Sequence, residues 1–152
     1  MPVFTIMQWF FKCAKIYYSA TVHGHARITD NAEIYGEAEI YDYATVRSNT
    51  SVHIKAKVFG NATIYGNADI YGDSKVSSNK DYIVFKNFWS SGRYFTWTRS
   101  NNKWRVGCFY GTGKELIKKA YADNKKSGRE YKRVVRYAES ILADEQKDKQ
   151  LT

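Results

Sequence analysis

The stretch Asn61-Ala-Thr-Ile-Tyr-Gly-Asn-Ala-Asp-Ile-Tyr-Gly72 reads NATIYGNADIYG and contains two near copies of one six-residue unit. The unit continues outward from this stretch without an insertion. Its aliphatic position is always valine or isoleucine: Val22, Ile28, Ile34, Ile40, Val46, Val52, Val58, Ile64, Ile70 and Val76. The position two residues earlier is always small: Ala20, Ala26, Ala32, Ala38, Ala44, Thr50, Ala56, Ala62, Ala68 and Ser74. A fixed short period of this length predicts a stacked repeat architecture.

The physical chemistry of the unit predicts the shape of the stack. A β-branched residue favours a short strand, and residues two apart in a strand point to the same side, so the small and the aliphatic residue both face inward. Glycine or aspartate then turns the chain because both tolerate a positive φ: Gly24, Asp30, Gly36, Asp42, Gly60, Gly66 and Gly72. Three such walls close a triangular prism with 18 residues per coil over residues 20–80.

An 18-residue coil also predicts columns of outward side chains. Asn31, Asn49 and Asn67 fall one coil apart and predict an amide ladder. The position after the aliphatic residue gives three further columns: Tyr17, Tyr35, His53 and Tyr71; His23, Tyr41 and Phe59; Thr29, Arg47 and Tyr65. Because exposed apolar groups that adjoin one another mark interfaces, we expect a subunit or partner interface at six of these residues. They are Tyr35, Tyr41, His53, Phe59, Tyr65 and Tyr71.

The uninterrupted pattern aliphatic-x-x-x-small-x resembles the hexapeptide-repeat left-handed β-helix family, and the resemblance covers residues 14 or 20 to about 79. It implies a left-handed parallel β-helix and a homotrimer packed about the prism axis. The YGNA-like units, followed by a basic module, also resemble small hexapeptide-repeat proteins of bacteriophages. That likeness implies a phage-encoded protein in the host cytoplasm. A rigid scaffold with outward aromatic residues, joined to a basic module, favours a protein that blocks or redirects a host macromolecule, for example a defence component.

The residues on either side of the repeat differ from it in composition. Residues 1–19 are expected to cap one end of the prism. Their apolar stretch Val3–Phe11 has no basic residue before it and is too short to span a membrane, which favours a cytoplasmic protein. Cys13 and Cys108 are expected to be reduced thiols. Most of the formal charge of +9 belongs to residues 81–152, which favours an anionic partner for this half.

Residues 81–152 predict a small basic α+β module. A strand is expected over residues 82–85, and a hairpin over residues 93–99 and 104–110. Two helices follow, with capping boxes expected at residues 112–115 and 127–130, and the polar residues after Ala143 are expected to fray. Packed against the prism, such a module would cover the open strands at its end.

The hairpin of this module combines basic and aromatic residues. Its candidate residues for binding a partner or an anion are Arg93, Trp97, Arg99, Lys103 and Arg105. Interleaved arginine and aromatic side chains can stack on bases and hold phosphates, which predicts nucleic-acid or nucleotide binding. The alternative is that the aromatic residues of this hairpin form the core beneath the two helices.

The family resemblance also implies an activity, since many hexapeptide proteins transfer acetyl groups from coenzyme A with a histidine on an inserted loop. Here His23, His25 and His53 occupy ordinary repeat positions, and their spacing does not match the family's three-histidine metal site. We therefore expect no catalytic residue, no metal and no cofactor. The leading expectation is a non-catalytic binding or scaffold protein that engages a host macromolecule. Nucleic-acid or nucleotide binding and a minimal acyltransferase are the alternatives.

Overall fold

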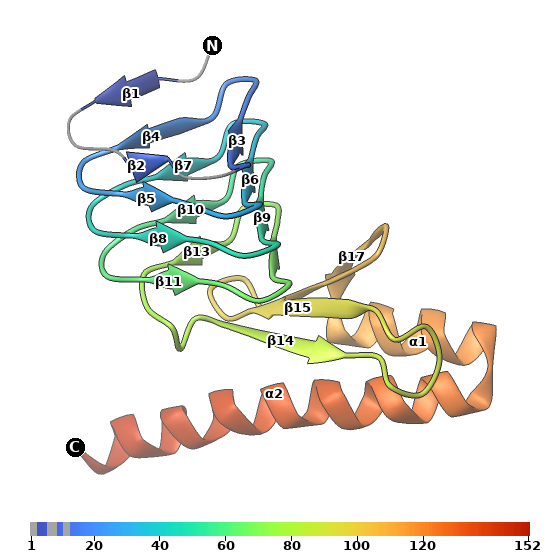
Figure 1. The fold of residues 1–152 in the computed structure, drawn as a ribbon. Coiled ribbons are helices and arrows are strands. Elements are labelled where there is room, and N and C mark those ends of the chain that lie inside the picture. Colours follow the sequence, from blue (N-terminus) through green and yellow to red (C-terminus); the bar gives the residue numbers. More distant parts are fainter. Residues whose placement is uncertain (1–2, 6–8, 11–12) are drawn as a thin grey trace.

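The computed structural model describes residues 3–5, 9–10 and 13–152, with side chains described from residue 13 onward. It shows a stack of short parallel strands that leads into an antiparallel sheet and two helices (Figure 1). The strands of the stack form three parallel sheets, here named A, B and C.

Each sheet of the stack contains every third strand of the solenoid. Sheet A contains β1 (Val3–Thr5), β4 (Thr21–His23), β7 (Glu39–Ile40), β10 (Lys57–Val58) and β13 (Lys75–Val76). Sheet B contains β2 (Trp9–Phe10), β5 (Arg27–Ile28), β8 (Thr45–Val46) and β11 (Thr63–Ile64). Sheet C contains β3 (Lys15–Ile16), β6 (Glu33–Ile34), β9 (Ser51–Val52) and β12 (Asp69–Ile70). Paired residues are 18 apart, as in Val22 with Ile40, so the predicted β-solenoid with three walls is confirmed.

The interior of the solenoid is made by the two inward positions of the repeat. All ten aliphatic residues are fully buried, and the small residues beside them are at most 1% exposed. Burial of this uniform kind is the main stabilising contribution of the repeat, because each coil removes its apolar side chains from water.

Every corner of the solenoid has the same backbone conformation. A positive φ occurs at every sixth residue: Tyr18, Gly24, Asp30, Gly36, Asp42, Ser48, Ile54, Gly60, Gly66 and Gly72. Three of these positions, with tyrosine, serine and isoleucine, lack the expected turn residues. The corner geometry therefore overrides local preference, and the cost is greatest at the β-branched Ile54.

The segment expected as a cap, residues 1–19, contains strands in the register of the repeat. β1 pairs with β4, β2 with β5 and β3 with β6, each in parallel and 18 residues apart. The parallel pairing of the solenoid thus extends back to Val3.

The C-terminal module begins with an antiparallel sheet, here named sheet D. Its strands are β14 (Tyr82–Lys86), β15 (Tyr94–Thr98), β16 (Lys103–Val106) and β17 (Phe109–Thr112), in that spatial order. Helices α1 (Gly113–Asp123) and α2 (Lys125–Leu151) pack on the face of sheet D turned away from the solenoid (Figure 1). The module has a core of its own, formed by Phe95, Trp97, Trp104, Leu116, Ala120, Tyr131, Val135 and Ala138.

The two helix starts differ from one another. Thr112 and Glu115 form the predicted capping box of α1. The second predicted capping box is wrong, because α2 begins at Lys125 and Asn124 accepts the hydrogen bond from Ser127 N. The tail expected to fray continues α2 to Leu151, since its glutamate, lysine, glutamine and leucine residues are good helix formers.

Candidate functional site

The junction between solenoid and module is built from hydrogen bonds to the last coil. Asp69 N donates to Thr96 Oγ1 over 2.9 Å, and Lys75 N donates to Ser100 Oγ over 2.8 Å. Module side chains thus satisfy backbone donors of β12 and β13 that no further coil pairs. The module therefore covers an edge of the solenoid that would otherwise be open to pairing with another chain.

The last strand of sheet B is satisfied by residues that follow the repeat. Asn79 Oδ1 accepts from Thr63 N over 2.9 Å. The Tyr82 hydroxyl donates to Thr63 O over 2.9 Å and accepts from Tyr65 N over 3.4 Å. All three sheets of the solenoid thus end on contacts with residues 79–100.

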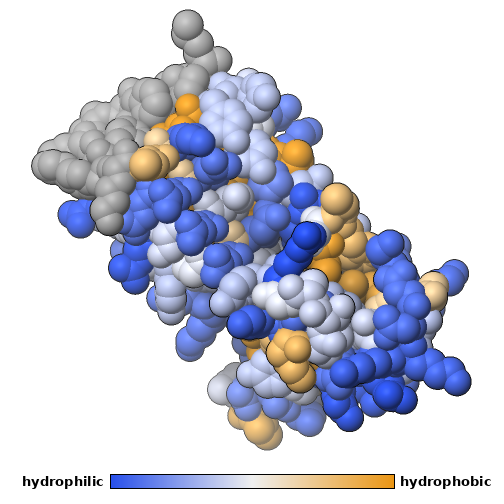
Figure 2. Space-filling model, turned by 45° about the vertical axis from the view of Figure 1, so that its right-hand side comes forward, coloured by the Kyte–Doolittle hydropathy of each residue, from blue (hydrophilic) through white to orange (hydrophobic). Residues whose placement is uncertain are grey.

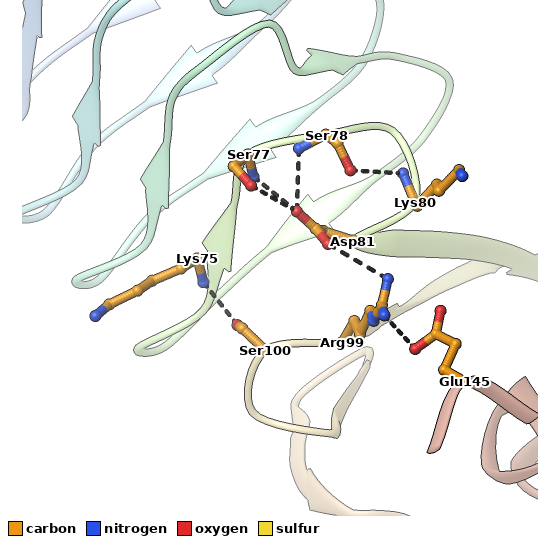
Figure 3. A network of polar contacts seen from close by, with 8 residues as sticks. All are labelled: Lys75, Ser77, Ser78, Lys80, Asp81, Arg99, Ser100 and Glu145. Atoms are coloured by element: carbon orange, nitrogen blue, oxygen red, sulfur yellow. Dashed lines mark hydrogen bonds and ion pairs between the residues drawn. The ribbon is translucent and has the colours of Figure 1, made fainter. Parts of the chain in front are cut away.

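Arg99, one of the predicted anion-binding residues, forms contacts within the protein (Figure 3). Its guanidinium lies 3.9 Å from Asp81 Oδ1 and pairs with Glu145 of α2. Asp81 in turn accepts hydrogen bonds from the backbone of Ser77 and Ser78. Arg99 therefore connects the end of the solenoid to the long helix.

Arg105 makes the second internal connection. Its Nε lies 3.2 Å from Asp69 Oδ2, and its Cζ lies 3.9 Å from the centre of the Tyr71 ring. The other oxygen of Asp69 is 2.5 Å from His53 Nε2. A guanidinium held by a carboxylate on one side and a ring on the other joins β16 firmly to sheet C.

The aromatic column on sheet C continues into the module. Ring centres are 5.0 Å apart for Tyr17 and Tyr35, 4.4 Å for Tyr35 and His53, and 4.6 Å for His53 and Tyr71. Tyr110 of β17 adds a further ring 4.7 Å from Tyr71. Since His53 is only 5% exposed, this end of the column is interior rather than an available surface.

The electrostatic surroundings of this column favour neutral tyrosines. Burial, followed by the charge of Asp69, raises the pKa of Tyr35 to about 12. Burial and the nearby Asp73 raise the pKa of Tyr110 to about 12. The hydrogen bond from Asn101 holds the pKa of Asp73 below its usual value.

The corresponding columns on the other two sheets stay at the surface. On sheet A, Tyr41 stacks between His23 and Phe59 with ring centres 5.2 Å apart on each side. On sheet B, Tyr65 is 50% exposed, with the Arg47 guanidinium 5.2 Å from its ring centre. The predicted amide ladder is confirmed where Asn31 Nδ2 donates to Asn49 Oδ1 over 3.2 Å.

The remaining predicted residues of the hairpin lie in three different environments. Trp97 is fully buried and donates to Asn102 Oδ1 over 2.9 Å, so it belongs to the core. Lys103 Nζ lies 5.1 Å from the centre of the Tyr110 ring. Arg93 is exposed and, with its neighbour Tyr94, lines a hollow of about 370 Å³ between the module and sheet C.

A larger hollow, the Tyr65–Tyr94 groove, lies beside the last coil and has a volume of about 480 Å³. Its lining residues are Tyr65, Gly66, Asn67, Asn79, Tyr82, Ile83, Val84 and Tyr94. Three consecutive residues of β14 line it. Tyr82 and Val84 pack against the solenoid core and Ile83 packs against the core of the module, so the groove opens where β14 leaves the last coil. β14 is one of the two edge strands of sheet D, a fact that no sequence pattern in this segment indicated.

Comparison of the chain with protein-family models, with curated protein sequences and with solved structures gives no match. Neither α1 nor α2 is both long and apolar enough to cross a membrane. Among residues 13–152, no three histidine, cysteine, aspartate or glutamate side chains come together in a metal-binding arrangement.

Each histidine of the chain is held in a stack of rings. His23 stacks on Tyr41, and His25 stacks on Tyr43 at a distance of 4.8 Å. His53, the one paired with a carboxylate, is buried under the module. The features open to a partner thus include the Tyr65–Tyr94 groove, the exposed basic side chains of the module and the aromatic column of sheet A.

Proposed function

We propose that this protein is a non-catalytic binding protein and that its Tyr65–Tyr94 groove holds an extended segment of a partner protein. The observation that supports this most directly is the groove itself, which is lined by three consecutive residues of β14, a strand at one edge of sheet D. An edge strand offers unpaired backbone groups to a peptide that adds to the sheet, while neighbouring pockets take its side chains.

The side chains of the groove suit a protein ligand. Tyr65 and Tyr94 are 50% and 46% exposed, and Ile83 and Val84 supply apolar surface between them. Tyrosine is enriched among residues that dominate binding energy because its ring combines a large apolar area with a polar hydroxyl. The fully packed solenoid supplies a rigid support, so little conformational entropy would be lost on binding.

The family resemblance and the rigid aromatic scaffold joined to a basic module favour a host macromolecule, such as a defence component, as the partner. Four of the six proposed interface residues, Tyr35, Tyr41, Phe59 and Tyr65, lie outside the contact between Tyr71, His53 and the module. The proposal therefore includes a homotrimer whose subunits contact one another through these four residues. Light scattering should then give three times 17.6 kDa, and the mass of one chain at micromolar concentration would contradict the trimer.

The test of the groove uses two single variants of the full chain, Tyr65→Ala and Tyr43→Ala. Tyr43 is a matched control, since it is a 64% exposed tyrosine on the solenoid, stacked on His25 and outside the groove. Proteins captured from a bacterial lysate by the unaltered chain would be purified and titrated against each variant by calorimetry. We expect Tyr65→Ala to weaken the complex by about 30-fold, the loss typical of a dominant interface residue, and Tyr43→Ala to have little effect.

A second variant in the groove makes the test independent of a single residue. Val84→Lys places a charge in the groove and should weaken the same complex; because Val84 also packs against the solenoid core, circular dichroism should first show that this variant is folded. If the captured proteins bind both groove variants as tightly as the unaltered chain, the proposed function is wrong.

A further inference from the structure

The two helices carry more positive charge than the hairpin in which the sequence predicted an anion site. Residues 113–136 contain nine basic and three acidic residues, a balance of +6 out of +9 for the whole chain. The basic residues are Lys114, Lys118, Lys119, Lys125, Lys126, Arg129, Lys132, Arg133 and Arg136. Figure 2 shows strongly hydrophilic surface gathered over the helical end of the molecule, at the lower right of the view.

Little of this charge is compensated within the protein. Of these nine basic residues, all of which the structure describes, only Arg133 has an ion pair, 2.8 Å from Glu130. Glu115, a second of the three carboxylates, accepts the hydrogen bond from Thr112 N at the start of α1. By contrast, Arg99 and Arg105 are both engaged by carboxylates at the junction.

Four of the cations form a straight row on α2. With 3.6 residues per turn, Lys125, Arg129, Lys132 and Arg136 fall within an arc of about 60° and along about 16 Å of the helix. The buried residues Tyr131, Val135 and Ala138 lie on a different side of α2, so the row does not contribute to the core.

Helix α1 adds two cations beside this row. A side chain at Gly128 would meet Tyr121, and one at Gly113 would meet Val135, so the antiparallel register of the two helices is fixed by close approach. This register brings the turn of Lys118 beside that of Lys132, and the turn of Lys114 beside that of Arg136. Six uncompensated cations, here named the helix-pair basic face, thus adjoin one another: Lys114, Lys118, Lys125, Arg129, Lys132 and Arg136.

We infer that the helix-pair basic face binds the phosphate backbone of a double-stranded nucleic acid. A linear row with one cation per helical turn matches a regular linear polyanion. Contacts of lysine and arginine with phosphate oxygens carry no sequence information, so binding through such contacts should be independent of sequence. A membrane surface fits less well, since the apolar side of α2 is buried against sheet D instead of being free to enter a bilayer.

This inference goes beyond the proposed function and rests on different residues. A chain that fails to bind a protein in the Tyr65–Tyr94 groove can still bind nucleic acid, and the reverse also holds. The groove variants therefore serve as a second reference in the nucleic-acid experiment.

The test measures binding of the full chain to a mixed-sequence DNA duplex of about two helical turns by fluorescence anisotropy. Contacts with about six phosphates predict a slope of log affinity against log salt of about −5. Arg129→Gln with Arg136→Gln should reduce affinity by about 100-fold near 50 mM salt and change the slope to about −4. Glutamine keeps the helix propensity of arginine, so circular dichroism should show unchanged helix content.

The matched control removes the same charge from the solenoid, by Arg27→Gln with Lys55→Gln, both exposed residues. This variant should bind the duplex within about twofold of the unaltered chain, because salt largely screens the attraction between the duplex and charges outside the contact. Lys118→Gln with Lys132→Gln provides a second pair on the basic face and should repeat the loss.

Three results would overturn the inference. The first is a duplex affinity that does not fall with salt, and the second is an equal loss in the solenoid control. The third is binding to polyglutamate or to anionic lipid vesicles as tight as binding to the duplex, which would assign the face to an acidic protein or a membrane.

Discussion

The outer faces of sheet A and sheet C carry aromatic columns at the same repeat position, and the two columns have different surroundings. On sheet C, Tyr71 lies against Arg105 and Tyr110 of the module. On sheet A, Tyr41 contacts the rings above and below it in its own column. The repeat thus determines that a ring points outward, whereas the path of the later chain determines whether that ring becomes interior.

The largest expected effect comes from the direct test of this difference, Tyr71→Ala against Tyr41→Ala. Tyr71→Ala removes the ring that supports Arg105 and should lower the free energy of unfolding by about 2–3 kcal/mol. Tyr41→Ala removes two stacked contacts at the surface and should cost about 1 kcal/mol. Urea denaturation of both variants measures the difference, and equal losses would show that the module does not depend on the sheet C column.

The corner that follows sheet C offers a second comparison, between Gly72 and Ile54 one coil earlier. Gly72 has φ +73° and lies against the Tyr110 side chain, so Gly72→Ala should cost about 2 kcal/mol through clash and strain. Ile54 has φ +64° and is 42% exposed, so Ile54→Gly should relieve strain and gain about 0.5–1 kcal/mol. Thermal and urea denaturation should show opposite signs, and a loss for Ile54→Gly would contradict the strain at this corner.

The smallest expected effect is a dependence on alkaline pH. Tyr35 and Tyr110 have a pKa of about 12 in the folded protein, against 10.0 for an ordinary tyrosine. Their contribution to stability is complete below pH 10 and is lost as the pH rises toward 12, because only the unfolded chain ionises in that window. Denaturation midpoints should fall between these pH values, and Tyr35→Phe with Tyr110→Phe should flatten the decline. If the midpoint of the double variant falls with pH as steeply as that of the unaltered chain, other groups cause the decline.

The sequence predicted the solenoid well because each of its features depends on local period. Inward aliphatic and small residues, three walls and the ladder between Asn31 and Asn49 all follow from residues six or 18 apart. The start of α2 was placed wrongly because Asn124 and Ser127 are both good cap residues, and the helix uses Asn124. The candidate site was predicted less well, since Arg99 and Arg105 looked free in a segment without acidic neighbours.

The sequence by itself determined which side chains face inward, because side chains alternate along a strand and a corner follows every six residues. Columns such as Asn31, Asn49 and Asn67 also indicated the 18-residue coil. The sequence also determined where the positive charge is concentrated. Only the tertiary structure decided which cations are compensated, since Asp69 and Glu145 lie 36 and 46 residues from the arginines they bind. Ion pairs form between groups that are close in space. The six-residue repeat does not reveal which solenoid residues lie close to which module residues.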